Sequence, residues 1–537
     1  MKRLVMSVLA FVSMQLWPGV VDGQTVSEPQ PLDAASIAQV NAAMDAGQLT
    51  SEQLVQRYLA RIAAYDRKGP AIHAVISLNA NALSEARALD AERKSKGRRS
   101  PLHGIPLVLK DNFDTRDLPT TAGSVLLEGH QPSRDAAVVQ QLRNAGAIIL
   151  AKVNLSEFAS GGTFSSLGGQ TLNPHALAYS PGGSSGGTGA AVAAAFAQFG
   201  LGTDTGGSIR GPATVNGIVA LKPTLGLISR TGIVPLALSF DTGGPMTRSV
   251  SDLALVLGIM TAADPTDSST LVSSRRVLTD YTPHLKADAL RGARIGVLRD
   301  FVGYDTDVDW VVEASLDVMR RQGATVVDVR LPAWVLTAKD AWYTAVRFPE
   351  FPVQLAEYLR TTGDTFPKSL DELVTRAREH TSLGTNGTGP NPSRWSRFLA
   401  EQRSGSLSDV RYRSVKEHAL PLLRQLLTGL MDEQQLDAFV YPTQPVKPER
   451  LDAASTGAAP DPMNLANLSG FPDLIVPAGF SGNHLPIGLS FMGRAWSEPR
   501  LIELAFAFEQ ATQARRLPVH TPLLGHMSGT RRVPNTP

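Results

Sequence analysis

The sequence predicts an α/β fold built around a covered, partly parallel sheet. Two short apolar runs, GIPLVLKDNF at 104–113 and AGAIILAKVNL at 145–155, are bounded by Gly and Asn residues, which is typical of buried strands. The segment between them, DAAVVQQLRNAG, has the pattern of a helix that ends at Gly146. A helix between two buried strands favours a sheet that is parallel in this region and covered by helices.

Further segments extend the pattern along the chain. LTSEQLVQRYLARIAAYD predicts an amphipathic helix, because Thr50 and Gln53 have capping-box spacing and apolar residues then follow on one helical face. ARIGVLRD at 293–300 and GATVVDVRLP at 323–332 predict two more strands around a helix.

Three other segments are expected outside this regular pattern or beside a pocket. Residues 262–290 and 380–397 are polar and rich in turn residues, so we expect surface loops or linkers there. The aromatic stretch from Trp334 to Phe351 either packs in the core or lines a substrate pocket.

Length, charge and cysteine content narrow the possible functions. The chain has 537 residues, of which 43% are hydrophobic and 19% charged, an ordinary globular composition that allows a large core. Its formal net charge is +2 without a long basic run or an acidic tail, so charge gives no reason to expect nucleic acid as a partner. The absence of cysteine excludes disulfides, thiolate zinc sites and a cysteine nucleophile.

The first 23 residues have the pattern of a signal peptide. Lys2 and Arg3 precede an apolar stretch from Leu4 to Trp17, which is too short for a comfortable membrane span of about 20 residues. Val21 and Gly23 are small residues at the spacing of a cleavage site. We therefore expect a protein exported to the periplasm or secreted, starting at Gln24 and without a stable membrane span after cleavage.

The segment YSPGGSSGGTGAAVAAAFAQFGLGTDTGGSIRGPA, from Tyr179 to Ala213, holds two Gly-Gly-Ser clusters around an alanine-rich stretch. Glycine permits left-handed backbone and close approach of other groups, so two such clusters predict two tight turns that face a site. The stretch between them, Thr188 to Phe199, predicts a helix.

Several kinds of hydrolase are excluded by their motifs. GGSSG fits G-x-S-x-G, but the proline-containing segment before it is not a buried strand, as a nucleophile elbow requires. No lysine follows a serine by three residues, H-E-x-x-H is absent, and no phosphate-binding loop occurs. The sequence therefore predicts neither a metal nor a cofactor.

A serine nucleophile with a lysine base is what remains. A lysine accepts the proton of a serine hydroxyl only when burial or nearby positive charge holds it neutral. Lys110, Lys152 and Lys222 each end an apolar run, and each also fits an ordinary lysine that extends from a strand end into water. The residues alone do not rank the three.

The stretch from about Pro101 to Val250 closely resembles the amidase signature family of serine hydrolases, and within it the bacterial peptide amidases. The resemblance rests on GIPLVLKDN, TTAGS, PGGSSGG, GLGTDTGGSIRGPA, ALKPT and, near the C-terminus, NLANLSGFPDLIVPAGF. It covers residues 33–516 and is weakest at about 300–450, the variable substrate region. It implies a single amidase domain over 24–537, with a central twisted mixed sheet covered by helices on both faces.

The resemblance also implies the catalytic residues. It places the nucleophile at Ser208, a bridging serine at Ser184, which follows a cis peptide bond from Gly183, and the base at Lys110.

An oxyanion hole is expected in the second glycine cluster. Gly206 and Gly207 let consecutive backbone N–H groups, those of Thr205, Gly206, Gly207 and Ser208, turn towards one point. Supporting residues are expected at Ser185, Asp204 and Arg210.

The expected activity is hydrolysis of an amide C–N bond through an acyl-enzyme, with release of ammonia or an amine from a small-molecule or peptide amide. Two alternatives stay open on the same site: the glutaminase-type subunit of a tRNA-dependent amidotransferase, and a carbamate or ester hydrolase. A non-catalytic binding protein is disfavoured, because it would not retain Lys110 together with both serines.

Overall fold

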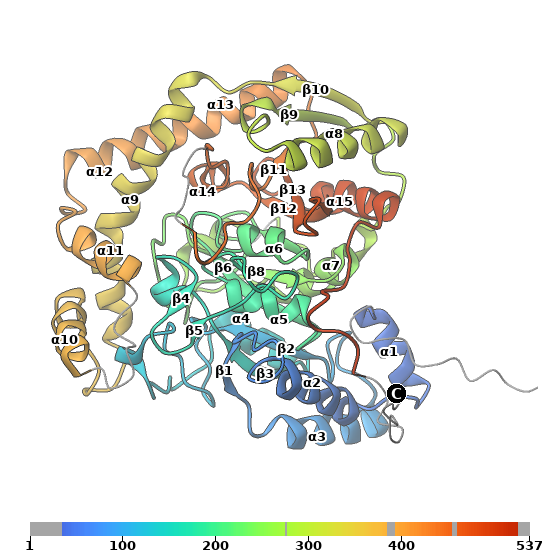
Figure 1. The fold of residues 1–537 in the computed structure, drawn as a ribbon, viewed down its shortest axis with the longest axis vertical. Coiled ribbons are helices and arrows are strands. Elements are labelled where there is room, and N and C mark those ends of the chain that lie inside the picture. Colours follow the sequence, from blue (N-terminus) through green and yellow to red (C-terminus); the bar gives the residue numbers. More distant parts are fainter. Residues whose placement is uncertain (1–34, 274–275, 384–391, 454–458, 525–537) are drawn as a thin grey trace, which may run out of the picture.

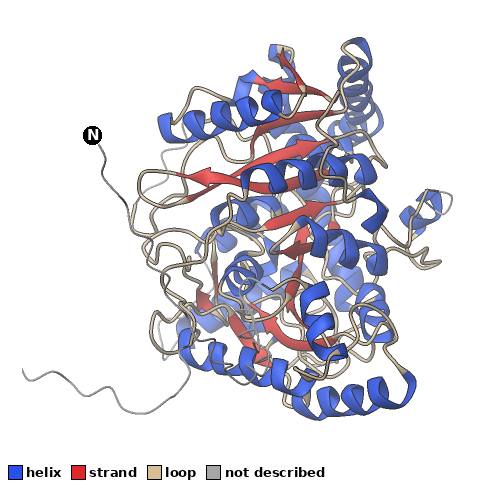
Figure 2. Cartoon of the chain, turned by 90° about the vertical axis from the view of Figure 1, so that its right-hand side faces the viewer, coloured by secondary structure: helices blue, strands red, loops and turns tan. Residues whose placement is uncertain are grey.

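The computed structural model describes residues 35–273, 276–383, 392–453 and 459–524. An 11-stranded sheet runs through the molecule, with helices on both sides of it (Figures 1 and 2). Its strands are β1 (Val75–Leu78), β2 (Pro106–Lys110), β3 (Ile148–Val153), β6 (Phe199–Asp204), β7 (Val219–Lys222), β8 (Thr242–Thr247), β9 (Arg294–Leu298), β10 (Thr325–Val329), β11 (Ala438–Pro442), β12 (Asp473–Phe480) and β13 (Pro486–Met492). A two-stranded sheet joins β4 (Phe164–Ser165) and β5 (Gly169–Gln170).

The sheet is mixed, as predicted. Its strand order is β1-β3-β2-β6-β8-β7-β12-β13-β11-β9-β10. β2 is parallel to both β3 and β6, and β9 is parallel to both β10 and β11. The remaining pairs of neighbouring strands are antiparallel. β2, β3 and β6 are buried along their whole length, which explains the nearly continuous apolar sequence of β2 and β3.

The helices cover the sheet and build one side of the molecule. They are α1 (Ile37–Asp45), α2 (Ser51–Tyr65), α3 (Ala82–Lys96), α4 (Ala137–Asn144), α5 (Gly186–Ala193), α6 (Arg210–Val215), α7 (Val250–Met260), α8 (Thr306–Arg321), α9 (Ala333–Leu359), α10 (Leu370–Leu383), α11 (Pro392–Gln402), α12 (Val410–Ser414), α13 (Leu420–Glu433), α14 (Asn464–Ser469) and α15 (Glu498–Thr512). Figure 1 shows α9 to α12 together on the left of the sheet, so most of the segment expected to vary with substrate forms one region.

Several predicted elements are confirmed. Thr50 caps α2, and its hydroxyl and the side chain of Gln53 form the reciprocal capping box. The two apolar runs at 104–113 and 145–155 are the parallel strands β2 and β3, with α4 between them in sequence. β9, α8 and β10 likewise form the predicted strand–helix–strand unit, and its strands are parallel.

The helix predicted from Thr188 to Phe199 is wrong at its C-terminal half. α5 ends at Ala193, and the chain turns at Ala195, whose φ is +52°, before Phe199 begins strand β6. High alanine content favours helix locally, but burial of FGLGTD between β2 and β8 overrides that preference.

The loop predicted at 380–397 is wrong at both ends of the segment, which are helical, and residues 384–391 lie outside the described part of the chain. The described part of 262–290 is a loop with short 3-10 turns. α10 extends to Leu383 and α11 begins at Pro392. The buried face of α11 carries Arg394 and Glu401 beside Phe398. Because charged residues occupy the buried positions, the sequence lacks the apolar period by which a helix is usually recognised.

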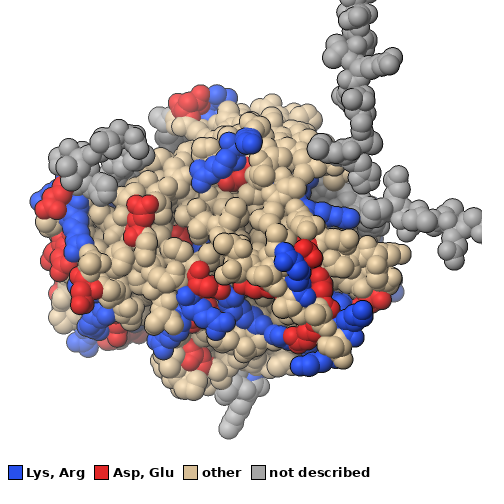
Figure 3. Space-filling view, turned by 90° about the horizontal axis from the view of Figure 1, so that it is seen from below, with Lys and Arg blue, Asp and Glu red and all other residues tan. Residues whose placement is uncertain are grey.

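The surface agrees with the small net charge. Figure 3 shows Lys and Arg side chains interspersed with Asp and Glu over one face of the molecule, without a large area of one sign. Among the described residues, no helix is both long and apolar enough to cross a membrane.

Candidate active site

Lys110 ends strand β2 inside the protein. It is fully buried, and its Nζ donates to Ser184 Oγ at 2.6 Å, to Thr203 Oγ1 at 2.8 Å and to the Thr203 carbonyl at 3.3 Å. Burial lowers the pKa of Lys110 from 10.5 to about 7, although the carboxylates of Asp204 and Asp241 act in the opposite direction. The amine is therefore half neutral at neutral pH and lies directly against a serine hydroxyl.

Ser184 lies between the first glycine cluster and helix α5. The Gly183–Ser184 peptide bond is cis, as the resemblance implied. A Cβ added at Gly183 would lie 2.7 Å from Ser156 Oγ, so this turn accepts only glycine without a shift of its neighbours. The Ser184 carbonyl accepts a hydrogen bond from the N–H of Ser156, which fixes the turn from its other side.

Ser208 follows strand β6 in the second glycine cluster. Its carbonyl accepts from the Ser185 N–H at 3.1 Å, so the two serine-containing turns are joined directly. Ser208 is partly exposed, whereas Ser184 and Lys110 are buried. Within the described part of the chain, the Ser208 hydroxyl has no hydrogen-bond partner. The buried amine of Lys110 contacts the buried Ser184 hydroxyl, and the accessible Ser208 hydroxyl belongs to the adjoining turn.

Ser185 supports the same arrangement through the backbone. Its hydroxyl donates to the Thr203 carbonyl at 3.2 Å and accepts from the Thr203 N–H at 3.3 Å. Thr203 in turn receives hydrogen bonds from Lys110 and from Asn112 Nδ2 on its hydroxyl. Ser185 therefore positions the residue that holds the Lys110 amine.

The other two candidate lysines are engaged elsewhere. Lys152 is buried in an ion pair with Asp111 at 3.0 Å and also donates to Thr120 Oγ1 at 2.8 Å. Lys222 donates to the carbonyls of Pro223 and Phe471, both at 2.7 Å. Burial lowers the pKa of Lys222 to about 7 as well, so a lowered pKa alone does not identify the base. Of these three lysines, Lys110 is the one whose amine contacts Ser184.

The predicted oxyanion-hole segment lies at the end of β6. Its four N–H groups differ in whether they already have a hydrogen-bond partner. The Gly207 N–H donates to Asp204 Oδ1 at 2.8 Å, so the carboxylate already occupies it, and the expectation for this group needs correction. For the N–H groups of Thr205, Gly206 and Ser208, the structure gives no partner among the residues it describes. The Thr205 hydroxyl donates to Asp241 at 2.5 Å and holds the segment in place.

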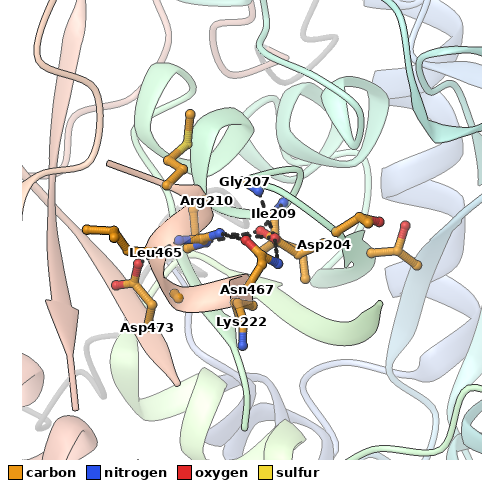
Figure 4. A network of polar contacts seen from close by, with 12 residues as sticks. Asp204, Gly207, Ile209, Arg210, Lys222, Leu465, Asn467 and Asp473 are labelled. Carbon is orange, nitrogen blue, oxygen red and sulfur yellow. Dashed lines mark hydrogen bonds and ion pairs between the residues drawn. The ribbon is translucent and has the colours of Figure 1, made fainter. Parts of the chain in front are cut away.

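Asp204 and Arg210 form the centre of a buried polar network, in which Asp204 accepts from the N–H groups of Gly207 and Ile209 (Figure 4). Arg210 contacts both Asp204 oxygens at 3.1 Å and Asp473 Oδ2 at 2.9 Å. Asn467 bridges the pair, because its Nδ2 donates to Asp204 and its Oδ1 accepts from Arg210. Burial alone would raise the pKa of Asp204, but Arg210 and the hydrogen bonds, including that from the Ile209 N–H, hold it well below its usual range.

This network also bears on Lys110. A negative Asp204 near the amine would favour protonated lysine, yet Arg210 compensates that charge at close range. The sequence predicts Asp204 and Arg210 only as supporting residues, and the structure gives them a defined place: they shape the turn that carries Ser208.

Sequence reasoning missed several residues at the site. Asn467 and Asp473 lie more than 250 residues from Asp204 and Arg210 in the chain, so no local spacing pointed to them. Tyr343, in the aromatic stretch, lies against the oxyanion segment: a Cβ added at Gly206 would be 2.7 Å from its hydroxyl. Core packing of that stretch is confirmed, because α9 places Val346 in the core, whereas its role in lining an acyl pocket stays a prediction.

The described residues include no cluster of His, Cys, Asp and Glu able to hold a metal ion.

Known proteins resemble this chain in both sequence and structure. A family model described as Amidase matches residues 53–502. A glutamyl-tRNA(Gln) amidotransferase subunit of Roseiflexus castenholzii is 37% identical over 90% of this chain and 96% of its own, and a probable amidase of Arabidopsis thaliana is 33% identical over 91% and 92%. Native peptide amidase from Stenotrophomonas maltophilia has a TM-score of 0.83 and 40% identity over 90% of this chain and 98% of its own. The corresponding amidotransferase subunit from Thermotoga maritima has a TM-score of 0.70 and 28% identity over 91% and 98%.

Proposed function

The chain belongs to the amidase family and hydrolyses amide C–N bonds, and we propose that it is an exported serine amidase that uses Ser208, Ser184 and Lys110. The observation that carries this proposal is the 2.6 Å contact between a buried lysine of lowered pKa and the Ser184 hydroxyl. It gives a base that is available at neutral pH without histidine or metal.

In the proposed reaction, neutral Lys110 takes the proton of Ser184 while Ser184 takes that of Ser208. The Ser208 oxygen attacks the amide carbonyl and forms a tetrahedral intermediate. The free N–H groups of Thr205, Gly206 and Ser208 are suited to stabilise its oxyanion. The proton returns through Ser184 to the leaving nitrogen as the C–N bond breaks, which releases ammonia or an amine and leaves an acyl-enzyme.

Water then attacks the ester carbonyl of the acyl-enzyme, with the same two groups accepting its proton. Collapse of the second tetrahedral intermediate returns the proton to Ser208 and releases the carboxylic acid. The Thr203 carbonyl accepts hydrogen bonds but has no proton to give. The Thr203 hydroxyl also lies near the amine of Lys110, at 2.8 Å, and Ser184 Oγ, at 2.6 Å, is the nearer of the two hydroxyl groups.

We propose C-terminal peptide amides or other primary carboxamides as substrates. The higher TM-score and identity to a peptide amidase than to a solved amidotransferase subunit support this substrate class. The test is release of ammonia or amine from a panel of peptide amides, fatty amides, anilides and carbamates. Turnover confined to carbamates or esters would overturn the proposal.

The second candidate, a glutaminase-type subunit, is favoured by the names of curated relatives, among which seven amidotransferase subunits are 35–38% identical to this chain. It predicts hydrolysis of glutamine, dependent on partner subunits. The signal-peptide pattern at residues 1–23 argues against it, because tRNA charging and its ATP are cytoplasmic.

Those first residues lie outside the described part of the chain, so export is a proposal from sequence alone. N-terminal sequencing of the protein from its native host tests it, and the expected mature terminus is near Gln24. An intact N-terminus on cytoplasmic protein would favour the amidotransferase candidate.

A further inference from the structure

A cavity of about 260 Å³ is lined by Gly182 and Gly183 of the first glycine cluster, next to Ser184 in the chain. Its wall also includes Val215 on the helix that follows Ser208. Met463 also lines it, and a Cβ added at Gly207 would lie 2.7 Å from the Met463 sulfur. The cavity therefore borders the proposed catalytic serines from both of their turns.

The size and lining of the cavity suit part of a small organic molecule. Pockets for drug-sized ligands measure about 300–1,000 Å³, so a cavity of about 260 Å³ is large enough for part of such a ligand. Pro445, Val446 and Pro448, in the segment after β11, give it an apolar wall. Ammonia, the product released from a primary amide, needs no such space, so the cavity is available to the acyl part of the substrate.

Gln444 is the distinctive polar group in this wall. It is half-buried, follows strand β11 by two residues, and its Nε2 lies 3.4 Å from the position that a Cβ of Gly211 would take. Among the described residues, its carboxamide makes no hydrogen bond. The hydroxyl of Ser180, another lining residue, already accepts a hydrogen bond from the Gly182 N–H. A carboxamide offers one acceptor and one N–H₂ donor, which complement the N–H and carbonyl of a peptide group.

The charges around the cavity disfavour an anion. Lys447 is paired with Asp305 at 3.2 Å and Asp307 at 2.8 Å, so its charge is compensated. The other charged side chains that line the cavity are the carboxylates of Glu449 and Asp461. A carboxylate on the bound group would meet repulsion here.

We propose that this cavity binds the peptide group next to the scissile carboxamide, and that Gln444 is the residue that reads it by hydrogen bonding. The inference rests on the proposed function, because it assigns the acyl side of that reaction. If the cavity has this role, N-acylated amino-acid amides should have a higher kcat/KM than simple carboxamides of the same shape. An anionic N-acyl group should lower kcat/KM.

The test compares two amides that differ only in the acetamido group: N-acetyl-phenylalaninamide and 3-phenylpropanamide. The wild type should favour the first in kcat/KM by about tenfold or more, because a site that hydrogen-bonds a substrate group discriminates against an analogue lacking it. Gln444→Met, which keeps the length of the side chain, should lower kcat/KM for N-acetyl-phenylalaninamide by about tenfold and leave 3-phenylpropanamide within about twofold. With wild type, N-succinyl-phenylalaninamide, whose N-acyl group is anionic, should have a lower kcat/KM than N-acetyl-phenylalaninamide.

Gln444→Leu repeats the measurement with a different apolar shape, and Gln56→Leu, at an exposed glutamine of α2, is the matched control that should change neither substrate. Equal loss on both amides, or an unchanged preference in folded Gln444 variants, would overturn the inference while leaving the proposed function intact. If wild type released ammonia from neither amide, the proposed function itself would fail, and the inference with it.

Discussion

Replacing Lys110 by Met tests the proposed base through two independent quantities, the pH dependence of activity and that of stability. With a pKa of about 7, half of the Lys110 side chains are neutral at pH 7. A lysine of pKa 10.5 would be neutral in only about one molecule in 3,000. Burial therefore raises the population of usable base by about three orders of magnitude.

The activity of wild type should follow this titration. We expect kcat/KM for an amide to rise along a single limb with an apparent pKa near 7, to be about tenfold below its plateau at pH 6, and to stay level above pH 8. Lys110→Met should abolish amide turnover at every pH. A limb near pH 10, or no limb between pH 5 and 9, would refute the assignment.

Stability supplies the second quantity. Lowering the pKa of Lys110 from 10.5 in the unfolded chain to about 7 in the native protein disfavours the charged native form by ~5 kcal/mol. Between these two pH values the unfolded chain binds more protons, so this residue makes the native state more stable as pH rises. Relative to Lys110→Met, wild type should gain about 2 kcal/mol in free energy of unfolding between pH 7 and pH 9.

The assay is urea unfolding of both proteins at pH 7 and pH 9. Lys222→Met is the matched control: Lys222 is equally buried and its pKa is also about 7, but it contacts carbonyls rather than the serines. This control should show a similar pH dependence of stability and keep amide turnover if it folds. Loss of turnover in folded Lys222→Met, with retention in Lys110→Met, would contradict the reasoning.

Three further predictions concern the surroundings of the base. Exhaustive chelation should leave amide turnover unchanged, and loss of activity restored by zinc would refute a metal-free serine mechanism. Arg210→Gln leaves two buried carboxylates, Asp204 and Asp473, without their cation, so unfolding should become easier by about 3–5 kcal/mol. The uncompensated charge should also move the acidic limb of kcat/KM to higher pH, and an unmoved limb would contradict the link to Lys110. Lys152→Met should cost about as much stability by isolating Asp111, yet leave the limb in place in pH-profile measurements.

How far the sequence predicts this molecule depends on the separation of the interacting residues. Strands β2 and β3 and the capped helix α2 depend on local patterns, and they were predicted near their observed bounds. Strand β6 was missed because glycine and alanine dominate FGLGTD and its neighbours. Its place between β2 and β8 is a tertiary effect that no local propensity contains.

The site shows the same division. Physical reasoning alone reduced the base to three lysines, and the resemblance selected Lys110, whose contact with Ser184 agrees with that selection. The roles of Asn467 and Asp473 depend on contacts across more than 250 residues, and the occupied N–H of Gly207 depends on side-chain geometry. Asn467 and Asp473 lie in NLANLSGFPDLIVPAGF, a motif that carries the resemblance, but the motif alone does not show which residues they contact.

The most direct test of the central claim is to map the site of covalent modification by a fluorophosphonate. We expect one adduct per chain on the peptide that contains Ser208, because this hydroxyl is the accessible end of the Lys110–Ser184 arrangement. Ser208→Ala should give no adduct, and its unfolding curve should match that of wild type. An adduct on another serine, or undiminished labelling of folded Ser208→Ala, would contradict the proposed nucleophile.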